Sequence, residues 1–315
     1  MTTLLLTHPS FVGHNMGDGH PEQPARMQAV DKALSGDAFA ALDRQDAPLR
    51  DDARDHILKA HPAAYYDTLA EHAPTAPGGR VQIDPDTAMS SGSWEAASRA
   101  VGAGLAAVDA VFAEDRKHRN VFCQVRPPGH HAERNRAMGF CLFSSIAIAA
   151  VYARDVYGAE RVAVVDFDVH HGNGTQDVFW SEPGLMFAST HQMPLFPGTG
   201  GRGETGDHDN ICNAPLNPGD GGSAFADAFR TRILPSVESF APDFVLISAG
   251  FDAHERDPLA NLRLTEADFE WATEQLLAVA ERHAHGRLVS MLEGGYHLDA
   301  LGRSAATHVK SLMGA

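Results

Sequence analysis

Residues 162–174, VAVVDFDVHHGNG, join an apolar run directly to a cluster of ionisable side chains. If residues 164–170 are extended, Asp166, Asp168 and His170 project to one side, because side chains alternate along a strand. A buried carboxylate without a partner is costly, so this face requires a cation or hydrogen-bond donors. Two carboxylates and an imidazole suit a divalent metal such as zinc. An isolated Asp-x-Asp is more often a salt-bridged or capping pair, and the spacing alone leaves both interpretations open.

A second polar cluster, RPPGHHAERNRAMGF (126–140), presents His130 and His131 side by side after a Pro-Pro-Gly turn. Adjacent histidines point in different directions, so each can have its own partner. A lone His-His pair is most often two loop histidines with satisfied hydrogen bonds. Beside an acidic strand end, however, a buried Asp or Asn can fix the tautomer of each ring while the other ring nitrogen faces a water.

The elements that must position these clusters are short apolar runs that alternate with helical patterns. The runs lie at 4–6, 121–125, 162–167, 185–188, 244–247 and 288–292, and the helical patterns lie at 93–115, 144–158 and 265–286. The last helix is expected to begin after Thr265 as N-cap, with Asp268 three residues later, and to end at His285-Gly286. Apolar strands separated by helices predict an α/β fold with a parallel sheet covered on both faces. Sites in such sheets form where the strands end, and the polar clusters follow the strands.

Length and composition favour one large domain over residues 1–315, because 43% of the 315 residues are hydrophobic and no change in composition divides the chain. The formal charge of −16 disfavours nucleic acid and anionic membranes as partners. No apolar run is long enough for a membrane span. The N-terminus MTTLLLTHPS is expected to be a strand and not a secretory signal. Three scattered cysteines without a Cys-x-x-Cys pair fit a reducing, cytoplasmic setting.

Seven motifs together resemble the zinc-dependent histone deacetylase family, in its class II and bacterial amidohydrolase-like branch, which includes acetylpolyamine amidohydrolases. They are HPEQPAR (20–26), RPPGHHA (126–132), GFC (139–141), DFDVHHGNGTQ (166–176), FPGTG (196–200), SAGFDAHERDPL (248–259) and EGGYH (293–297). The resemblance covers nearly the whole chain. It implies a three-layer arginase/deacetylase-like fold with a central, mostly parallel eight-stranded sheet.

The resemblance also implies a single zinc ion bound by Asp168, His170 and Asp252. Three protein ligands leave room for water and the substrate carbonyl, as a catalytic zinc requires. Two catalytic histidines would flank this metal, with His130 oriented by Asp166 and His131 oriented by Asn173. His131 is expected to be the principal general base and acid, with His130 as its electrostatic partner.

Further roles follow from the same motif matches. Tyr296 in EGGYH would donate its phenol proton to the developing oxyanion, since Gly294-Gly295 lets the backbone turn it inward. The resemblance places five residues around the substrate, with the contact of Asp86 at the rim: Gly139, Phe140, Phe196, Leu259 and Asp86. It assigns Arg26 and Gly129 to a region through which acetate leaves. A potassium ion is also expected, bound by Asp166, Asp168, His170, Ser189 and Thr190.

These observations predict an amidohydrolase that removes acetyl or other acyl groups from linear amines. Acetyl-lysine substrates are favoured, because Leu259 lies where a polyamine-specific branch of the family has an acidic residue. Acetylpolyamines and other small acylamides remain an alternative. Homo-oligomerisation is left open.

Two other classes of protein compete with this prediction. A binuclear manganese ureohydrolase would need additional aspartates, but this chain has Asp168-Val-His170-His-Gly and a lone Asp252 followed by Ala253-His254. A catalytically silent binding protein of the same fold is opposed by the complete set of ligands, histidines and tyrosine, since loss of any one of them would be enough to silence an enzyme.

Overall fold

An eight-stranded sheet runs through the centre of the computed structural model, which describes residues 2–115 and 117–314. The strand order is β2-β1-β5-β10-β9-β6-β7-β8, and every neighbouring pair is parallel. The strands are β1 (Thr2–Thr7), β2 (Asp43–Asp46), β5 (His118–Cys123), β6 (Val162–Asp166), β7 (Leu185–Gln192), β8 (Ile211–Leu216), β9 (Phe244–Ala249) and β10 (Leu288–Leu292). The expected parallel eight-stranded sheet is thus confirmed.

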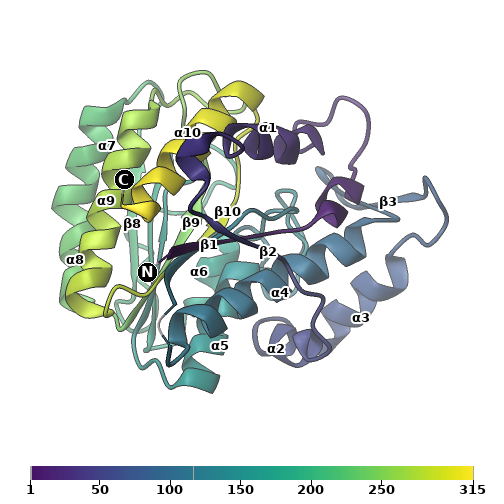
Figure 1. Ribbon diagram of the computed structural model, residues 1–315, viewed down its shortest axis with the longest axis horizontal. Helices are drawn as coiled ribbons and strands as arrows, with labels where there is room; N and C mark the ends of the chain where they lie inside the picture. Colours follow the sequence, from purple (N-terminus) through teal and green to yellow (C-terminus); the bar gives the residue numbers. More distant parts are fainter. Residues whose placement is uncertain (1, 116, 315) are drawn as a thin grey trace.

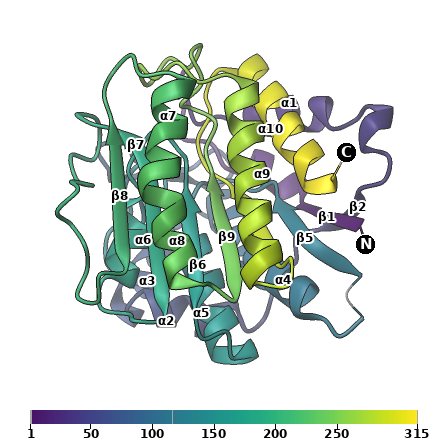
Figure 2. The same cartoon turned by 90° about the vertical axis from the view of Figure 1, so that its left-hand side faces the viewer.

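Helices cover both faces of this sheet, which gives the three layers visible in Figures 1 and 2. One face carries α2 (Ala53–Ala60), α3 (Ala63–His72), α4 (Ser93–Phe112), α5 (Ser145–Tyr157) and α6 (Asn173–Phe179). The other face carries α1 (Ala25–Ala33), α7 (Gly222–Ala228), α8 (Leu234–Phe240), α9 (Glu266–His283) and α10 (Leu298–Met313). Three short helical turns complete the set: η1 (Pro9–Gly13), η2 (Asp37–Phe39) and η3 (Phe229–Ile233). No helix within the described residues is long and apolar enough to cross a membrane.

The apolar cores on the two faces explain why the central strands are apolar on both sides. Along β6, Val162 and Val164 pack into the core under α4 and α5, while Ala163 and Val165 pack into the core under α9 and α10. A strand buried on both faces has no polar alternation, and its sequence is therefore a continuous apolar run.

The expected start of α9 is confirmed, and the helix ends two residues before the expected stop at His285-Gly286. The backbone N–H of Thr265 donates to Asp268 Oδ2 at 2.8 Å, and the Thr265 side chain accepts the backbone N–H of Asp268, which forms a capping box. The helix ends at His283, and Gly286 then has a positive φ of 77°. This turn leads the chain into β10 beside β9.

All strands of the eight-stranded sheet run in the same direction, so their carboxyl ends meet at a single edge of the sheet. There β5 ends at Cys123, β6 at Asp166, β7 at Gln192, β9 at Ala249 and β10 at Leu292, and the polar loops follow directly. The extended conformation considered for residues 164–170 does not reach that far, because β6 ends at Asp166 and the chain bends at 168–170. The strand pairing ends at this edge, so the polar groups of residues 167–170 bond to neighbouring loops.

A separate two-stranded sheet lies beside this edge. It consists of β3 (Arg80–Asp84) and β4 (Thr87–Ser90), which pair antiparallel. The turn between them carries Asp86, whose Oδ1 accepts the backbone N–H of Gly139 at 3.1 Å. The hairpin therefore places Asp86 against the loop that follows the histidine pair.

Candidate metal centre and active site

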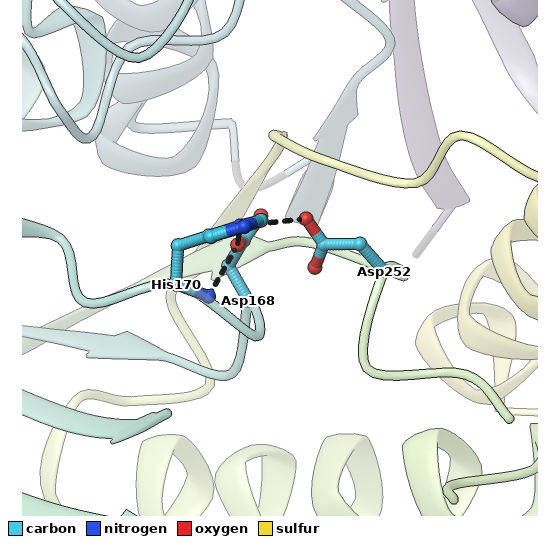
Figure 3. Close-up of side chains that lie close together, drawn as sticks. All are labelled: Asp168, His170 and Asp252. Atoms are coloured by element: carbon cyan, nitrogen blue, oxygen red, sulfur yellow. Dashed lines mark hydrogen bonds and ion pairs between the residues drawn. The ribbon is translucent and has the colours of Figure 1, made fainter. Parts of the chain in front are cut away.

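Three side chains from two loops converge at the carboxyl edge of the sheet, as Figure 3 shows. His170 Nδ1 lies 3.1 Å from Asp168 Oδ1 and 3.1 Å from Asp252 Oδ2. Asp168 and His170 follow β6, while Asp252 follows β9, the adjacent strand. One ligand atom from each residue lies within 4.8 Å of the other two, and all three side chains are buried.

Each aspartate has one oxygen facing His170, and its other oxygen accepts a hydrogen bond from a backbone N–H group, which orients the carboxylate. Asp168 Oδ2 accepts the N–H of Gly294 at 2.8 Å, and Asp252 Oδ1 accepts the N–H of Val169 at 2.8 Å. The backbone approaches so closely that a Cβ on Gly294 would lie 2.1 Å from Asp252 Oδ2. Glycine is required there because any side chain would displace the carboxylate.

The electrostatics of the cluster reflect its burial. Burial raises the pKa of Asp252 to about 7, and the nearby charge of Asp168 adds to this effect. Burial also acts to raise the pKa of Asp168, but His130 and His170 outweigh it and hold this pKa well below its usual range. Burying acidic groups together is unfavourable without a cation.

A divalent ion such as zinc fits these residues. Zinc accepts carboxylate oxygens and imidazole nitrogens as ligands. In metal sites the ligand side chains are usually oriented by further hydrogen bonds, as the backbone N–H groups orient the two aspartates here. The residues that sequence analysis assigned to zinc are thus the residues that the fold brings together.

The two adjacent histidines lie beside this cluster with different partners. His130 Nδ1 is 2.8 Å from Asp166 Oδ2, whereas His131 Nδ1 is 2.8 Å from Asn173 Oδ1. The ring centroids are 4.0 Å apart, and both rings are buried. Each histidine therefore contacts the side chain that the family resemblance implied as its partner.

The unlike partners separate the proton affinities of the two rings. Burial acts to lower the pKa of His130, but the charges of Asp166 and Asp168 outweigh it and raise this pKa well above 6.5. Burial lowers the pKa of His131 well below 6.5, and His130 and His170 lower it further. The surroundings therefore favour protonation of His130 and disfavour protonation of His131.

A pocket of about 220 Å³ reaches His170 of the metal cluster and His131 of the histidine pair. Its lining includes every residue that the sequence assigned to the substrate, together with Tyr296: Asp86, His131, Gly139, Phe140, His170, Leu195, Phe196, Leu259 and Tyr296. Phe196 is 38% exposed, so it lies at the mouth, and its ring meets that of His131 edge-on with centroids 5.1 Å apart. The sequence analysis did not predict Leu195, whose only distinguishing feature in the sequence is its position next to Phe196.

Phe140 and Gly139 form a tight turn against the histidine pair. Both have positive φ, 70° and 57°, and a Cβ on Gly139 would lie 2.4 Å from the His131 ring. The positive φ of a bulky residue is unusual and is held here by a hydrogen bond from Phe140 N to Thr87 Oγ1 at 3.0 Å. This turn presents the Phe140 ring to Tyr296, with centroids 5.7 Å apart.

Arg26 and Gly129, which the resemblance assigned to an exit for acetate, contact the segment that contains Glu293 and Gly295. Arg26 is fully buried and donates to the carbonyls of Gly295, at 2.7 Å, and Glu293. Its guanidinium also lies 5.0 Å from the centre of the Tyr296 ring. These contacts fix the backbone segment that carries Tyr296, and the exit role stays a prediction.

Glu293 is a second residue that sequence analysis missed. It is 1% exposed, and it accepts the backbone N–H groups of Gly129 at 2.6 Å and His130 at 3.2 Å. Burial raises the pKa of Glu293 to about 7. The position of this acidic residue, directly after an apolar strand, could have indicated a buried role for it. In the motif EGGYH, however, only Tyr296 was assigned a function.

The residues assigned to potassium lie on β6, β7 and the loop after β6. Ser189 pairs with Asp166 in the sheet register, and its hydroxyl lies 2.9 Å from His191 Nδ1. Thr190 follows on β7, and its Oγ1 is buried without a hydrogen-bond partner among the described residues. The fold thus gathers Ser189 and Asp166, while the potassium ion itself stays a prediction.

Comparison with known proteins agrees with this arrangement. The family model described as "Histone deacetylase domain" matches residues 20–312. The "Histone deacetylase-like amidohydrolase" of Pseudomonas aeruginosa is 38% identical over 283 residues, covering 88% of this chain and 73% of the relative. "Histone deacetylase 14, chloroplastic" of Arabidopsis thaliana is 37% identical over 329 residues, covering 99% and 77%. The crystal structure of the HDA15 HD domain superimposes with a TM-score of 0.90 at 32% identity, covering 99% of this chain and 88% of that one.

Fold, site and comparisons together define an enzyme that hydrolyses amide bonds. The chain belongs to the histone deacetylase family.

Proposed function

We propose that this protein is a zinc-dependent deacetylase in which Asp168, His170 and Asp252 bind one zinc ion. The observation that carries the proposal is the convergence of these three buried side chains, one of which, His170, lines a pocket together with His131 and Tyr296. Zinc, when bound there, supplies a Lewis acid that polarises the amide carbonyl and lowers the pKa of a water to roughly 7. We further propose that residues 1–315 form a single catalytic domain.

His131 acts as the general base and later as the general acid. It is held neutral by burial, so its Nε2 can accept the proton of the attacking water. The same nitrogen then gives a proton to the leaving amine. His130, paired with the carboxylate of Asp166, contributes positive charge near the developing oxyanion but is a poor base, because its proton is already held.

Tyr296 donates its phenol proton to the oxyanion. Its backbone is fixed by a hydrogen bond to Asp257 Oδ2 at 2.7 Å and by the contacts of Arg26, so the ring is presented to the pocket before substrate binds. Donors that are oriented in advance stabilise a transition state most, because no reorganisation is needed during the reaction.

The pocket supports a linear acylated amine as substrate, with acetyl-lysine favoured. The aromatic rings of Phe140 and Phe196 and the side chain of Leu259 form apolar walls that suit a methylene chain. Asp86 at the rim accepts hydrogen bonds, so it suits the N–H groups of a peptide. The alternative is an acetylpolyamine, for which Asp86 would face a second ammonium group.

A panel of acetyl-lysine peptides and acetylated polyamines separates these substrates, with each compound assayed with and without chelator. Peptide hydrolysis that is at least tenfold more efficient than polyamine hydrolysis supports the first substrate class. Hydrolysis that persists after complete metal removal contradicts the proposal as a whole.

Two further features belong to this proposal. The expected potassium ion would bind near Asp166, at the end of β6, and Ser189, its neighbour on β7. A cytoplasmic setting is supported by the three buried free cysteines, Cys123, Cys141 and Cys212, which form no disulfide.

A further inference from the structure

The side-chain amide of Asn173 connects His131 to a residue outside the pocket. Its Oδ1 lies 2.8 Å from His131 Nδ1. Its Nδ2 donates to Glu133 Oε1 at 2.8 Å and contacts Met138 Sδ at 3.4 Å. Asn173 is only 5% exposed, whereas Glu133 is partly open to solvent.

These neighbours determine which way the amide of Asn173 faces. A carboxylate and a thioether sulfur only accept hydrogen bonds, so the side of the amide toward Glu133 and Met138 must be the NH₂ group. The carbonyl oxygen then faces His131, and a carbonyl oxygen only accepts. His131 Nδ1 must therefore carry the proton, which leaves the lone pair on Nε2.

An asparagine needs this external support and an aspartate would not. Both oxygens of an aspartate accept, as those of Asp166 do beside His130, so a carboxylate fixes the tautomer of its histidine unaided. An amide that rotates by half a turn presents NH₂ to the histidine. His131 Nδ1 would then accept, and Nε2 would carry the proton and lose its ability to act as a base.

We propose that Glu133 is a positioning residue that holds the amide of Asn173 and thereby fixes the tautomer of His131. Glu133 itself is held by the backbone, because its N–H donates to the Arg136 carbonyl at 3.0 Å and its carbonyl accepts the N–H of Arg136 at 3.4 Å. The inference rests on the proposed role of His131 as general base. It assigns a function to a side chain that touches neither the metal ligands nor the substrate pocket.

Three substitutions at position 133 test the inference by kinetics on an acetyl-lysine peptide. Glu133→Gln keeps an acceptor oxygen for Asn173 and is expected to retain kcat within about threefold. Glu133→Ala removes the acceptor, and Glu133→Lys replaces it with a donor that favours the reversed amide. Glu133→Lys is expected to lower kcat by about tenfold or more, the value of a hydrogen bond to a charged group, with KM within about twofold of wild type.

A second background shows whether the effect passes through Asn173. In Asn173→Asp the side chain accepts on both oxygens, so the tautomer of His131 no longer depends on position 133. Adding Glu133→Lys to this background is expected to cause no further loss of kcat. An equal loss in both backgrounds overturns the inference. Glu71→Lys, on the exposed part of α3, makes the same change of charge and is expected to leave kcat unchanged.

The tautomer can also be read without any catalysis. In ¹⁵N-histidine-labelled protein at pH 8, the resonances that disappear in His131→Ala belong to His131. Wild type and Glu133→Gln are expected to show Nδ1 protonated, and Glu133→Lys to show protonation shifted to Nε2. Unchanged resonances in Glu133→Lys overturn the inference. Full activity of His131→Ala would instead refute the proposed function, while the tautomer measurement would still decide the role of Glu133.

Discussion

The rings of His130 and His131 lie with their centroids 4.0 Å apart, yet their Nδ1 atoms contact side chains of different charge. Asp166 favours the imidazolium of His130, whereas the neutral Asn173 leaves His131 free to accept a proton. This difference is the basis for the separate roles proposed for the two residues.

This separation predicts unequal losses when the histidines are removed. His131→Ala is expected to lower kcat by about 10²- to 10⁴-fold, the usual contribution of a general acid–base group. His130→Ala should cost less, because it removes charge and not the proton carrier. The comparison requires kcat on one acetyl-lysine peptide with zinc content matched between variants. A larger loss for His130→Ala would reverse the assignment.

The position of Tyr296 on the pocket wall predicts a specific kinetic defect. Tyr296→Phe keeps the ring and its contact with Phe140 but removes the hydroxyl. The expected loss in kcat is about 10²- to 10³-fold, with little change in KM, since the hydroxyl acts on the transition state. Steady-state kinetics of peptide hydrolysis measure both parameters. Unaltered kcat would show that the oxyanion has another donor.

The buried carboxylate of Glu22 predicts a large effect on stability. Its oxygens accept from Arg126 Nε at 2.5 Å and Nη2 at 2.6 Å, and Arg26 lies 3.1 Å away. Glu22→Leu leaves two buried guanidinium groups without their anion and is expected to lower the free energy of unfolding by about 3–5 kcal/mol. Urea denaturation measures this change. Asp67→Asn, which removes the exposed partner of Arg54, serves as a control and is expected to cost less than about 1 kcal/mol.

His308 predicts a dependence of stability on pH. Thr273 Oγ1 donates to the Phe269 carbonyl, so it accepts from His308 Nδ1 at 2.7 Å, and Ser290 lies 2.8 Å from Nε2. Burial lowers the pKa of His308 to about 3. Between this pH and about 6.5 the unfolded chain binds more protons than the native one, so stability falls as the pH falls.

Urea titrations at pH 7 and pH 5 test this expectation. The contribution of His308 to the difference in unfolding free energy is about 2 kcal/mol, from the difference between the folded and unfolded pKa values. His308→Gln should reduce the difference by that amount, while His72→Gln on the exposed part of α3 should not. An identical difference for wild type and His308→Gln would show that this ring titrates normally in the folded protein.

Much of the fold follows from the sequence because its central strands are buried on both faces. Six apolar runs predicted β1, β5, β6, β7, β9 and β10. The edge strand β2, with sequence DRQD, was not predicted, because it pairs only with β1 and is mostly exposed, so it needs no apolar side chains. At the other edge, β8 carries Asn213 and Pro215 within its six residues, and these interrupt the apolar pattern.

The candidate site was predictable where a motif carries a side chain with evident chemistry. Asp168, His170 and Asp252 come from two motifs and meet because β6 and β9 are neighbours. Glu133 and Glu293 lie inside quoted motifs, but their roles depend on which backbone and amide groups they contact. Such contacts arise from the folding together of distant loops, and residue type alone does not reveal them.

The central claim is that Asp168, His170 and Asp252 hold one zinc ion. Anomalous diffraction above and below the zinc absorption edge, from crystals of protein purified with zinc, tests this claim directly. The account predicts one zinc peak per chain, located between His170 Nδ1 and the facing oxygens of the two aspartates, and its loss in Asp252→Ala. A peak elsewhere, two peaks in this cluster, or none at full zinc occupancy in solution would contradict it.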